Sequence, residues 1–225
     1  QQKLGLRSGF AFDLQAACSG FVYGLATADN FIKTGQVKTA LVIGAEIFSR
    51  LVDWEDRTTC VLFGDGAGAF VLKASDDSTE NGILSTHLYS DGTYYDLLCT
   101  NGGPATTQTA GVVQMQGREV FKHAVSKMAG AVNDCLQHND LTDSDIDYLV
   151  PHQANQRIID SMGDKLGLPT SQVISTVAQH ANTSAASIPL AFSEGVKDGR
   201  IRRDALVLLE ALGAGFTWGS ALLRY

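Results

Sequence analysis

The stretch that decides the fold is Phe10-Ala-Phe-Asp-Leu-Gln-Ala-Ala-Cys18-Ser-Gly-Phe21. Residues 10–17 are mostly apolar with little polar alternation, which predicts a strand covered on both faces. From Phe21 onward, apolar residues recur every three or four positions until Gly35, which predicts a helix. The sequence therefore predicts a sharp turn from strand to helix, with Cys18 at its tip.

This position suits Cys18 for nucleophilic chemistry. At a helix N-terminus, unpaired backbone N–H groups and the helix dipole favour the thiolate over the thiol. The neighbours Ala16, Ala17, Ser19 and Gly20 are small and leave room for a substrate carbonyl. A nucleophile on a strand-to-helix turn is suited to acyl transfer. Most free cysteines are small buried hydrophobes, so this stretch alone leaves a structural role for Cys18 open.

The composition is typical of a folded α/β protein. Hydrophobic residues make up 44% of the 225 residues and charged residues only 18%, which predicts elements covered on both sides. The net charge of −7 argues against broad nucleic-acid binding. The four cysteines form neither a CxxC pair nor a metal-binding spacing, and we find no signal peptide or membrane-length apolar run. We expect a cytoplasmic protein with reduced thiols, no metal and no membrane contact.

Hydrophobic patterns predict alternating strands and helices along the chain. The predicted strands cover residues 39–45, 60–72 (interrupted by a glycine turn), 83–89, 147–151, 173–177, 204–210 and 216–224. The predicted helices after the first cover residues 115–137, 154–166 and 185–198. The run Gly64-Asp-Gly-Ala-Gly68 lacks the GxGxxG spacing and a following helix, so it predicts tight backbone packing and not a phosphate loop.

Two parts of the chain resemble each other. Residues 39–46 followed by 64–72 match residues 204–210 followed by 213–223, because each pair is a buried strand, a connection and a glycine-rich strand. This repeat predicts a duplicated β-α-β unit. The expected organisation is an N-terminal half at residues 1–80, a polar connection at 81–113 and a C-terminal half at 114–225.

Polar motifs follow two neighbouring predicted strands. Pro151-His152-Gln-Ala-Asn155 ends one of them, and His180-Ala-Asn182-Thr-Ser follows the next. Open α/β sheets place their sites at the carboxyl ends of strands, so His152 and Asn182 are expected to face one crevice. Taken singly, each motif is also explained by helix capping.

In combination, these motifs resemble the β-ketoacyl-[acyl-carrier-protein] synthase III family. The matching motifs, in the family's order, are Ala-Ala-Cys18-Ser-Gly, Pro-His152-Gln-Ala-Asn, Asn182-Thr-Ser-Ala-Ala-Ser and Gly213-Ala-Gly-Phe-Thr-Trp-Gly-Ser. The resemblance implies a thiolase-like fold, with duplicated βαβ halves and mixed sheets in an α-β-α-β-α layered sandwich. It also implies a homodimer built across the central sheets, and an N-terminal region ahead of this chain.

The resemblance implies an acyltransferase that initiates type II fatty acid synthesis. Acetyl-coenzyme A would acylate Cys18, and malonyl-acyl-carrier protein would then lose CO₂. The resulting enolate, held by His152 and Asn182, would attack acetyl-Cys18 to give acetoacetyl-acyl-carrier protein. The backbone N–H groups of Cys18 and Ala214 would hold the first oxyanion. Acetyl-coenzyme A enters as a substrate, and no permanently bound cofactor is implied.

The resemblance also assigns binding residues. The expected tunnel for coenzyme A or phosphopantetheine is lined by Arg57, Phe121, Ala154 and Asn155. The expected basic patch for the acidic acyl-carrier protein consists of Lys122, Arg157 and Lys165. On the residues alone, Phe121 fits the core stripe of its helix nearly as well, and solvated basic residues are usually plain surface.

Three other functions are weighed against this one. A papain-type Cys-His-Asn hydrolase requires a different local signature around the cysteine and no duplicated halves. A starter-unit synthase or acyltransferase of polyketide or secondary metabolism would use the same Cys-His-Asn chemistry and is the first alternative. A non-catalytic acyl-binding paralogue is the second, and it need not retain Cys18, His152 and Asn182 together.

Overall fold

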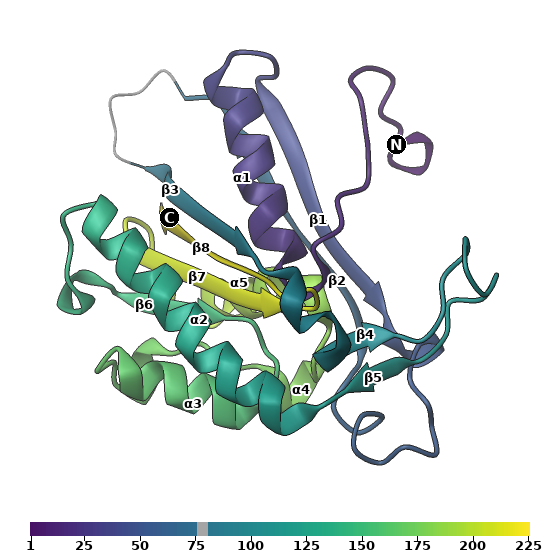
Figure 1. The fold of residues 1–225 in the computed structure, drawn as a ribbon. Helices are drawn as coiled ribbons and strands as arrows, with labels where there is room; N and C mark the ends of the chain where they lie inside the picture. Colours follow the sequence, from purple (N-terminus) through teal and green to yellow (C-terminus); the bar gives the residue numbers. More distant parts are fainter. Residues whose placement is uncertain (76–80) are drawn as a thin grey trace.

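The computed structural model describes residues 1–75 and 81–225 and consists of stacked layers of helix and sheet (Figure 1). The strands are β1 Thr39–Ile47, β2 Asp65–Lys73, β3 Gly82–Ser90, β4 Leu98–Thr100, β5 Val113–Met115, β6 Tyr148–Pro151, β7 Leu206–Gly213 and β8 Thr217–Arg224. The α-helices are α1 Gly20–Lys33, α2 Gly117–His138, α3 Gln156–Lys165, α4 Val177–His180 and α5 Ser187–Lys197.

The central sheet has four strands in the order β3-β8-β7-β6. The β6–β7 pair is parallel and the other pairs are antiparallel, so the sheet is mixed. Side chains alternate across it: Leu208 and Leu212 of β7 pack with α2 and α3, whereas Val207 and Leu209 pack with α1 and α5. Both faces of β7 are thereby covered, and all eight of its residues are buried.

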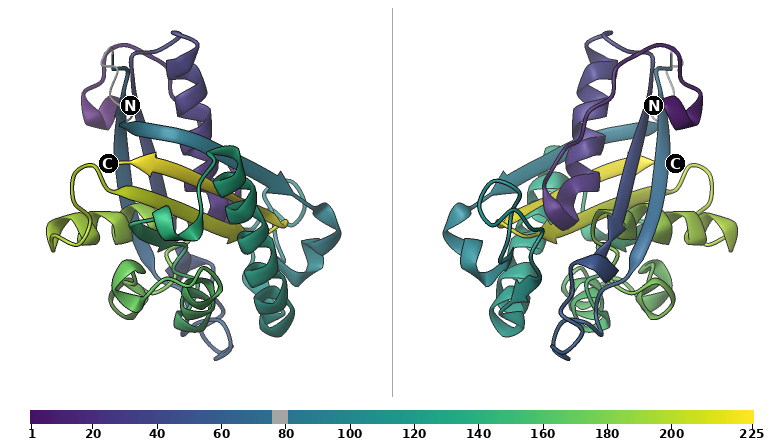
Figure 2. Two further views of the ribbon diagram at one scale, coloured as in Figure 1. Left: turned by 90° about the vertical axis from the view of Figure 1, so that its left-hand side faces the viewer. Right: turned by 90° about the vertical axis from the view of Figure 1, so that its right-hand side faces the viewer.

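A second sheet, formed by β1 and β2, lies on the other side of α1 and α5 (Figures 1 and 2). Val42 of β1 and Phe70 of β2 join the core that contains these two helices. The described residues therefore stack as helices, mixed sheet, helices and two-stranded sheet, which are four layers of the expected sandwich. The predicted α/β class with mixed sheets is confirmed.

Most elements lie where the hydrophobic periods predict them. The four long helices α1, α2, α3 and α5 begin and end within a few residues of the predicted bounds. The predicted strands at residues 39–45, 83–89, 147–151, 204–210 and 216–224 correspond to β1, β3, β6, β7 and β8. Long apolar periods and short apolar runs are therefore sufficient to place these elements.

The predicted buried strand at residues 10–17 is wrong. This segment is irregular up to Ala16, and the side chains of Phe10 and Phe12 are 55% and 60% exposed. Both rings pack on Phe31 of α1, with ring centroids 5.4 and 6.3 Å from it. No strand of the described residues pairs with the segment, so its apolar sequence does not lead to a β ladder.

The predicted glycine turn within residues 60–72 is also wrong. Gly66 and Gly68 lie inside the continuous strand β2, which pairs with β1 over all nine of its residues. A Cβ on Gly68 would lie 2.9 Å from the Pro189 Cβ of α5. The expectation of tight backbone packing is confirmed, because the missing side chain lets the helix lie directly on the strand.

The predicted strand at residues 173–177 is reduced to one isolated bridge between Leu149 and Val173. Beyond it, the Gln153 side chain takes the place of a strand partner, because its Oε1 accepts the Thr176 N–H at 2.7 Å. The chain then turns into the short helix α4. At Thr176, a buried side chain, and not a neighbouring backbone, forms the hydrogen bond with the backbone N–H group.

The polar connection contains more structure than its composition predicts. It supplies β3 to the central sheet and the β4–β5 pair beside the start of α2. The predicted end of the first half, at residues 76–80, lies outside the described residues. In the part of the chain that the structure describes, no helix combines the length and apolarity needed to cross a membrane.

Candidate active site

One cavity brings together the three predicted catalytic side chains. It has a volume of about 580 Å³, and Cys18, His152 and Asn182 all line it. The rest of its wall is largely apolar and includes Leu62, Phe63, Met115, Phe121, Met128 and Leu212. Three segments that are far apart in the sequence therefore meet at one mainly apolar site.

Cys18 is held on a tight turn by the end of the chain. It lies in the 3-10 turn Ala17–Ser19 directly ahead of α1, and Ala17 has a φ of 47°, which is unusual for a residue other than glycine. Thr217 Oγ1 donates to the Ala16 carbonyl at 2.8 Å, and Ser19 Oγ donates to the Thr217 carbonyl at 2.9 Å. A Cβ on Gly213 would lie 2.7 Å from the Cys18 nitrogen, so only glycine allows this approach.

Burial, and not the helix N-terminus, dominates the ionisation of Cys18. Desolvation raises the pKa of its thiol to about 11, with a smaller contribution from the charge of Glu46, while a hydrogen bond from Ser184 lowers it. The expected preference for the thiolate is therefore wrong for the free protein. The raised pKa favours the thiol form of Cys18 in the resting protein.

His152 is a buried, neutral imidazole. It directly follows β6, is 3% exposed, and its Nδ1 lies 2.7 Å from Ser187 Oγ at the start of α5. Burial lowers the pKa of His152 to about 4, so the ring carries no charge at neutral pH. Its engaged Nδ1 leaves Nε2 as the ring nitrogen available to a substrate.

Asn182 is held by the N-terminal part of the chain. Its backbone N–H donates to the Leu62 carbonyl and its carbonyl accepts the Gly64 N–H, both at 2.9 Å. Its side-chain Oδ1 accepts the Ser184 N–H at 2.9 Å. Because the oxygen is occupied and Nδ2 has no acceptor in the described residues, the amide is oriented to offer N–H groups to the cavity.

The cavity wall contains part of the predicted binding set. Phe121, Ala154, Asn155 and Arg157 line it, and Asn155 also caps α3 by accepting the Ile158 N–H at 3.1 Å. Arg57 is exposed outside the lining, although its neighbour Thr58 belongs to it.

The remaining predicted residues lie outside the cavity lining. Lys122 and Lys165 are exposed, and Lys122 lies 3.9 Å from Glu119. Ala214 is half-buried in the turn between β7 and β8. Arg118 lines the cavity and was missed by the sequence analysis. The signal in the sequence that could have identified Arg118 is its position in the first turn of α2, directly after the polar connection.

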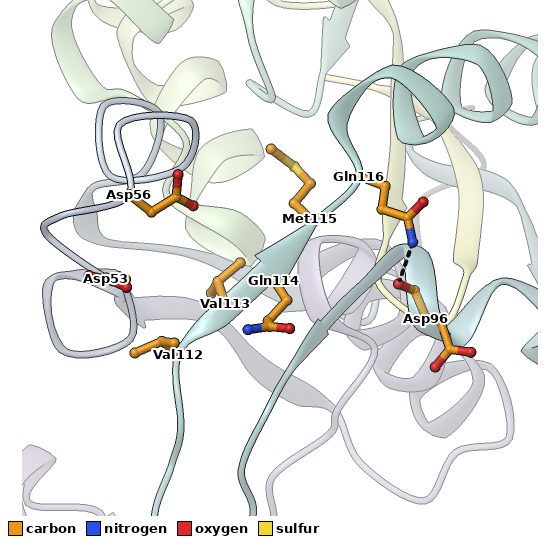
Figure 3. Close-up of a pocket in the computed structure, with 8 residues that line it drawn as sticks. All are labelled: Asp53, Asp56, Asp96, Val112, Val113, Gln114, Met115 and Gln116. Carbon is orange, nitrogen blue, oxygen red and sulfur yellow. Dashed lines mark hydrogen bonds between the residues drawn. The ribbon is translucent and has the colours of Figure 1, made fainter.

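An acidic pocket lies next to this cavity and shares Met115 with it. It has a volume of about 300 Å³ and contains Asp53, Asp56 and Asp96 (Figure 3). Asp56 already accepts hydrogen bonds from Thr58 and Thr59, which lower the pKa of its carboxyl. Across residues 1–75 and 81–225, no group of three or more His, Cys, Asp or Glu side chains is arranged to hold a metal ion.

Comparisons with known proteins show the family to which the chain belongs. Two family models match the chain: 3-oxoacyl-[acyl-carrier-protein (ACP)] synthase III over residues 12–92, and its C-terminal domain over residues 136–225. The β-ketoacyl-[acyl-carrier-protein] synthase III of Paramagnetospirillum magneticum is 65% identical over 227 aligned residues, which cover 100% of this chain and 70% of the relative.

Solved structures extend the comparison to the fold. The crystal structure of 3-oxoacyl-(acyl carrier protein) synthase III from Pseudomonas aeruginosa has a TM-score of 0.94 and 44% identity, covering 100% of this chain and 69% of that one. A priming β-ketosynthase of a polyketide biosynthetic pathway has a TM-score of 0.90 but only 34% identity, covering 99% and 68%. These matches confirm the predicted resemblance and the thiolase-like fold, and they favour the fatty-acid relatives over the polyketide alternative.

Proposed function

The chain belongs to the 3-oxoacyl-[acyl-carrier-protein] synthase III family of acyltransferases, which initiate fatty acid synthesis, and we propose that Cys18, His152 and Asn182 are its catalytic residues. The observation that carries this proposal is their meeting in one largely apolar cavity. A thiol, a neutral imidazole and an oriented amide are the groups that the two half-reactions require.

In the first half-reaction, the sulfur of Cys18 attacks the carbonyl carbon of acetyl-coenzyme A. The carbon–sulfur bond to coenzyme A breaks, acetyl-Cys18 forms, and the proton of the Cys18 thiol ends on the coenzyme A sulfur. Negative charge develops on the acetyl oxygen in the tetrahedral intermediate. We assign its stabilisation to the backbone N–H groups of Cys18 and Ala214, supported by the close approach of Gly213 to the Cys18 nitrogen.

In the second half-reaction, malonyl-acyl-carrier protein occupies the same cavity. Loss of CO₂ leaves an electron pair that spreads onto the thioester oxygen. His152 and Asn182 donate hydrogen bonds to this oxygen, and these donors act strongly because both side chains are buried away from bulk water. The carbanion then attacks the carbonyl carbon of acetyl-Cys18, and the carbon–sulfur bond breaks to give acetoacetyl-acyl-carrier protein. The Cys18 sulfur leaves as a thiolate and takes a proton from solvent, which restores the thiol.

The cavity wall suits a thin thioester arm. Phe121 and Ala154 supply apolar surface, and Asn155 lies beside them at the start of α3. We assign these residues to the phosphopantetheine arm shared by coenzyme A and acyl-carrier protein. Arg57, exposed next to lining residue Thr58, is assigned to a phosphate group at the entrance.

We assign the docking of acyl-carrier protein to the basic side chains at this entrance. Lys122 of α2 and Arg157 and Lys165 of α3 are exposed, and Arg157 lines the cavity itself. Arg118, the further cation in the lining, belongs to the same patch.

The proposed setting is a cytoplasmic homodimer made of two thiolase-like halves, residues 1–80 and 114–225, joined by residues 81–113. The support for an assembly is the outer face of the β1–β2 sheet, where Leu41, Ile43 and Val71 are exposed. Exposed apolar side chains on neighbouring strands are typical of a surface that another protein segment covers.

The test is the intact mass of the protein after incubation with acetyl-coenzyme A, with Cys18→Ala as the matched control. We expect one acetyl group on the wild type and none on the variant. Addition of malonyl-acyl-carrier protein should then remove the acetyl group and yield acetoacetyl-acyl-carrier protein. Acetylation of Cys18→Ala to the same extent as the wild type would disprove the assignment of the nucleophile.

A further inference from the structure

A serine outside the predicted catalytic set touches the catalytic histidine. Ser187 is the first residue of α5 and is 2% exposed. Its Oγ lies 2.7 Å from His152 Nδ1 and accepts the backbone N–H of Gln153 at 3.2 Å. A buried hydroxyl thus contacts both the imidazole and the peptide that follows it.

The direction of these hydrogen bonds follows from the number of protons. The Gln153 N–H can only donate, so Ser187 Oγ accepts that bond. The hydroxyl has one proton, and within the described residues His152 Nδ1 is the group in reach that can accept it. If Nδ1 carried the proton, the buried Ser187 O–H would have no acceptor, which is unfavourable. The Gln153 N–H, the Ser187 hydroxyl and His152 Nδ1 all form hydrogen bonds only when Nδ1 carries no proton.

A neutral imidazole carries one proton, so a bare Nδ1 requires that the proton be on Nε2. Burial lowers the pKa of His152 to about 4, and the ring is neutral at neutral pH. The nitrogen that remains available to a substrate therefore presents an N–H group. A ring in the other tautomer would present a lone pair, which repels a developing negative charge.

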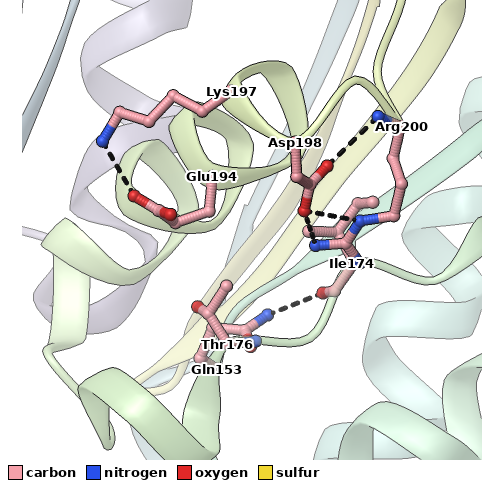
Figure 4. A network of polar contacts seen from close by, with 7 residues as sticks. All are labelled: Gln153, Ile174, Thr176, Glu194, Lys197, Asp198 and Arg200. Atoms are coloured by element: carbon pink, nitrogen blue, oxygen red, sulfur yellow. Dashed lines mark hydrogen bonds and ion pairs between the residues drawn. The ribbon is translucent and has the colours of Figure 1, made fainter.

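The serine is fixed relative to the ring by Gln153, which is fully buried. Gln153 Nε2 donates to the Ile174 carbonyl at 3.1 Å (Figure 4). It also donates to the Pro151 carbonyl at 2.7 Å, and Gln153 Oε1 accepts the Thr176 N–H. These bonds join the end of β6 to the segment before α4. Because the Gln153 N–H also binds Ser187, the start of α5 is tied to the same point.

We propose that Ser187 is a positioning residue that holds His152 in the Nε2–H tautomer, so that the ring donates a hydrogen bond to the thioester oxygen during decarboxylation. This inference rests on the proposed role of His152. In this tautomer, His152 Nε2 has no free electron pair and does not take the Cys18 proton in the first half-reaction. Loss of Ser187 should therefore slow decarboxylation more than acetylation.

The first test is spectroscopic and independent of activity. In protein labelled with ¹⁵N-histidine at neutral pH, His152 should show a proton bonded to Nε2 and a bare Nδ1, with His152→Asn used for assignment. In Ser187→Ala we expect a mixture of tautomers, and in Ser187→Thr, which keeps the hydroxyl, the wild-type pattern. Ser193→Ala, further along α5, is the matched control and should leave the signal unchanged.

The second test compares the half-reactions. For Ser187→Ala we expect about tenfold slower CO₂ release from malonyl-acyl-carrier protein, which corresponds to one buried hydrogen bond, and acetylation within about threefold of the wild type. Ser187→Thr should restore the decarboxylation rate. An unchanged tautomer in Ser187→Ala, or equal losses in both half-reactions, would overturn the proposal. Failure of the wild type to decarboxylate, with the tautomer as expected, would contradict the proposed function and not the hydrogen-bond direction.

Discussion

The central sheet and the β1–β2 sheet are built from similar apolar sequences but are buried differently. All eight residues of β7 in the central sheet are buried, because α2 and α3 cover one face and α1 and α5 cover the other. In β1 only Val42 and Gly44 are buried, and Ile43 is 53% exposed. The difference shows that burial follows from the number of covered faces and not from the apolar character of a strand.

The two parts of the chain hold each other's residues in the candidate active site. Cys18, from the first part of the chain, is held by Gly213 and Thr217 at the ends of β7 and β8. Asn182, from the second part, is held by Leu62 and Gly64 just ahead of β2. Each part of the chain therefore fixes a proposed catalytic residue that the other part supplies.

The largest expected effect concerns Glu210 in β7. Its side chain is fully buried, and neither carboxyl oxygen has a hydrogen-bond partner in the described residues. Burial raises the pKa of Glu210 from 4.5 to about 8. The unfolded chain therefore releases this proton near pH 4.5 while the folded protein keeps it until about pH 8, so stability falls as the pH rises through this range.

We expect Glu210→Gln to remove this pH dependence. Relative to the wild type, the variant should gain up to about 5 kcal/mol of unfolding free energy at pH 9 and little at pH 4. Urea denaturation across this pH range measures the difference. Parallel pH curves for Glu210→Gln and the wild type would contradict the expectation.

The second prediction compares the two strands directly. Leu208 in β7 is fully buried against α2 and α3, so Leu208→Ala should cost about 3 kcal/mol of unfolding free energy through lost burial and the cavity left behind. Ile43→Ala in β1 should cost within about 0.5 kcal/mol, because this side chain lies largely in solvent. Denaturant unfolding of both variants measures the two costs. Similar costs would show that β1 is covered in solution.

The smallest expected effects distinguish the contacts that position Asn182 from the contacts that position Cys18. A Cβ on Gly44 would lie 2.3 Å from the Ala185 carbonyl oxygen, so Gly44→Ala should shift the segment that carries Asn182 and slow decarboxylation about tenfold. Thr217→Val removes the hydrogen bond to Ala16 beside Cys18 and should instead slow acetylation, by a similar factor.

Rates of both half-reactions, measured on the two variants, show whether the two sets of contacts act separately. Gly130→Ala in α2 is the control, since a Cβ there meets nothing within 4 Å. If each variant slows acetylation and decarboxylation by the same factor, the two sets of contacts act on the site as a whole.

Much of the fold could be predicted from local pattern. The periods of three to four residues in α1, α2, α3 and α5, and the apolar runs of β6, β7 and β8, are properties of the segments themselves. Residues 10–17 and 173–177 were mispredicted because an apolar run becomes a strand only where a partner backbone is available. Phe31 and the Gln153 side chain provide their contacts instead.

The sequence by itself determined the chemistry that is present: a cysteine ahead of a helix, and a histidine and an asparagine after neighbouring predicted strands, in motifs that resemble a single family. Only the tertiary structure decided the ionisation and the hydrogen-bond partners of these residues. Burial raises the pKa of Cys18 and lowers that of His152, and Ser187 reaches His152 across 35 positions of sequence. Desolvation and hydrogen-bond direction depend on what surrounds an atom in space, and neighbours along the chain do not reveal it.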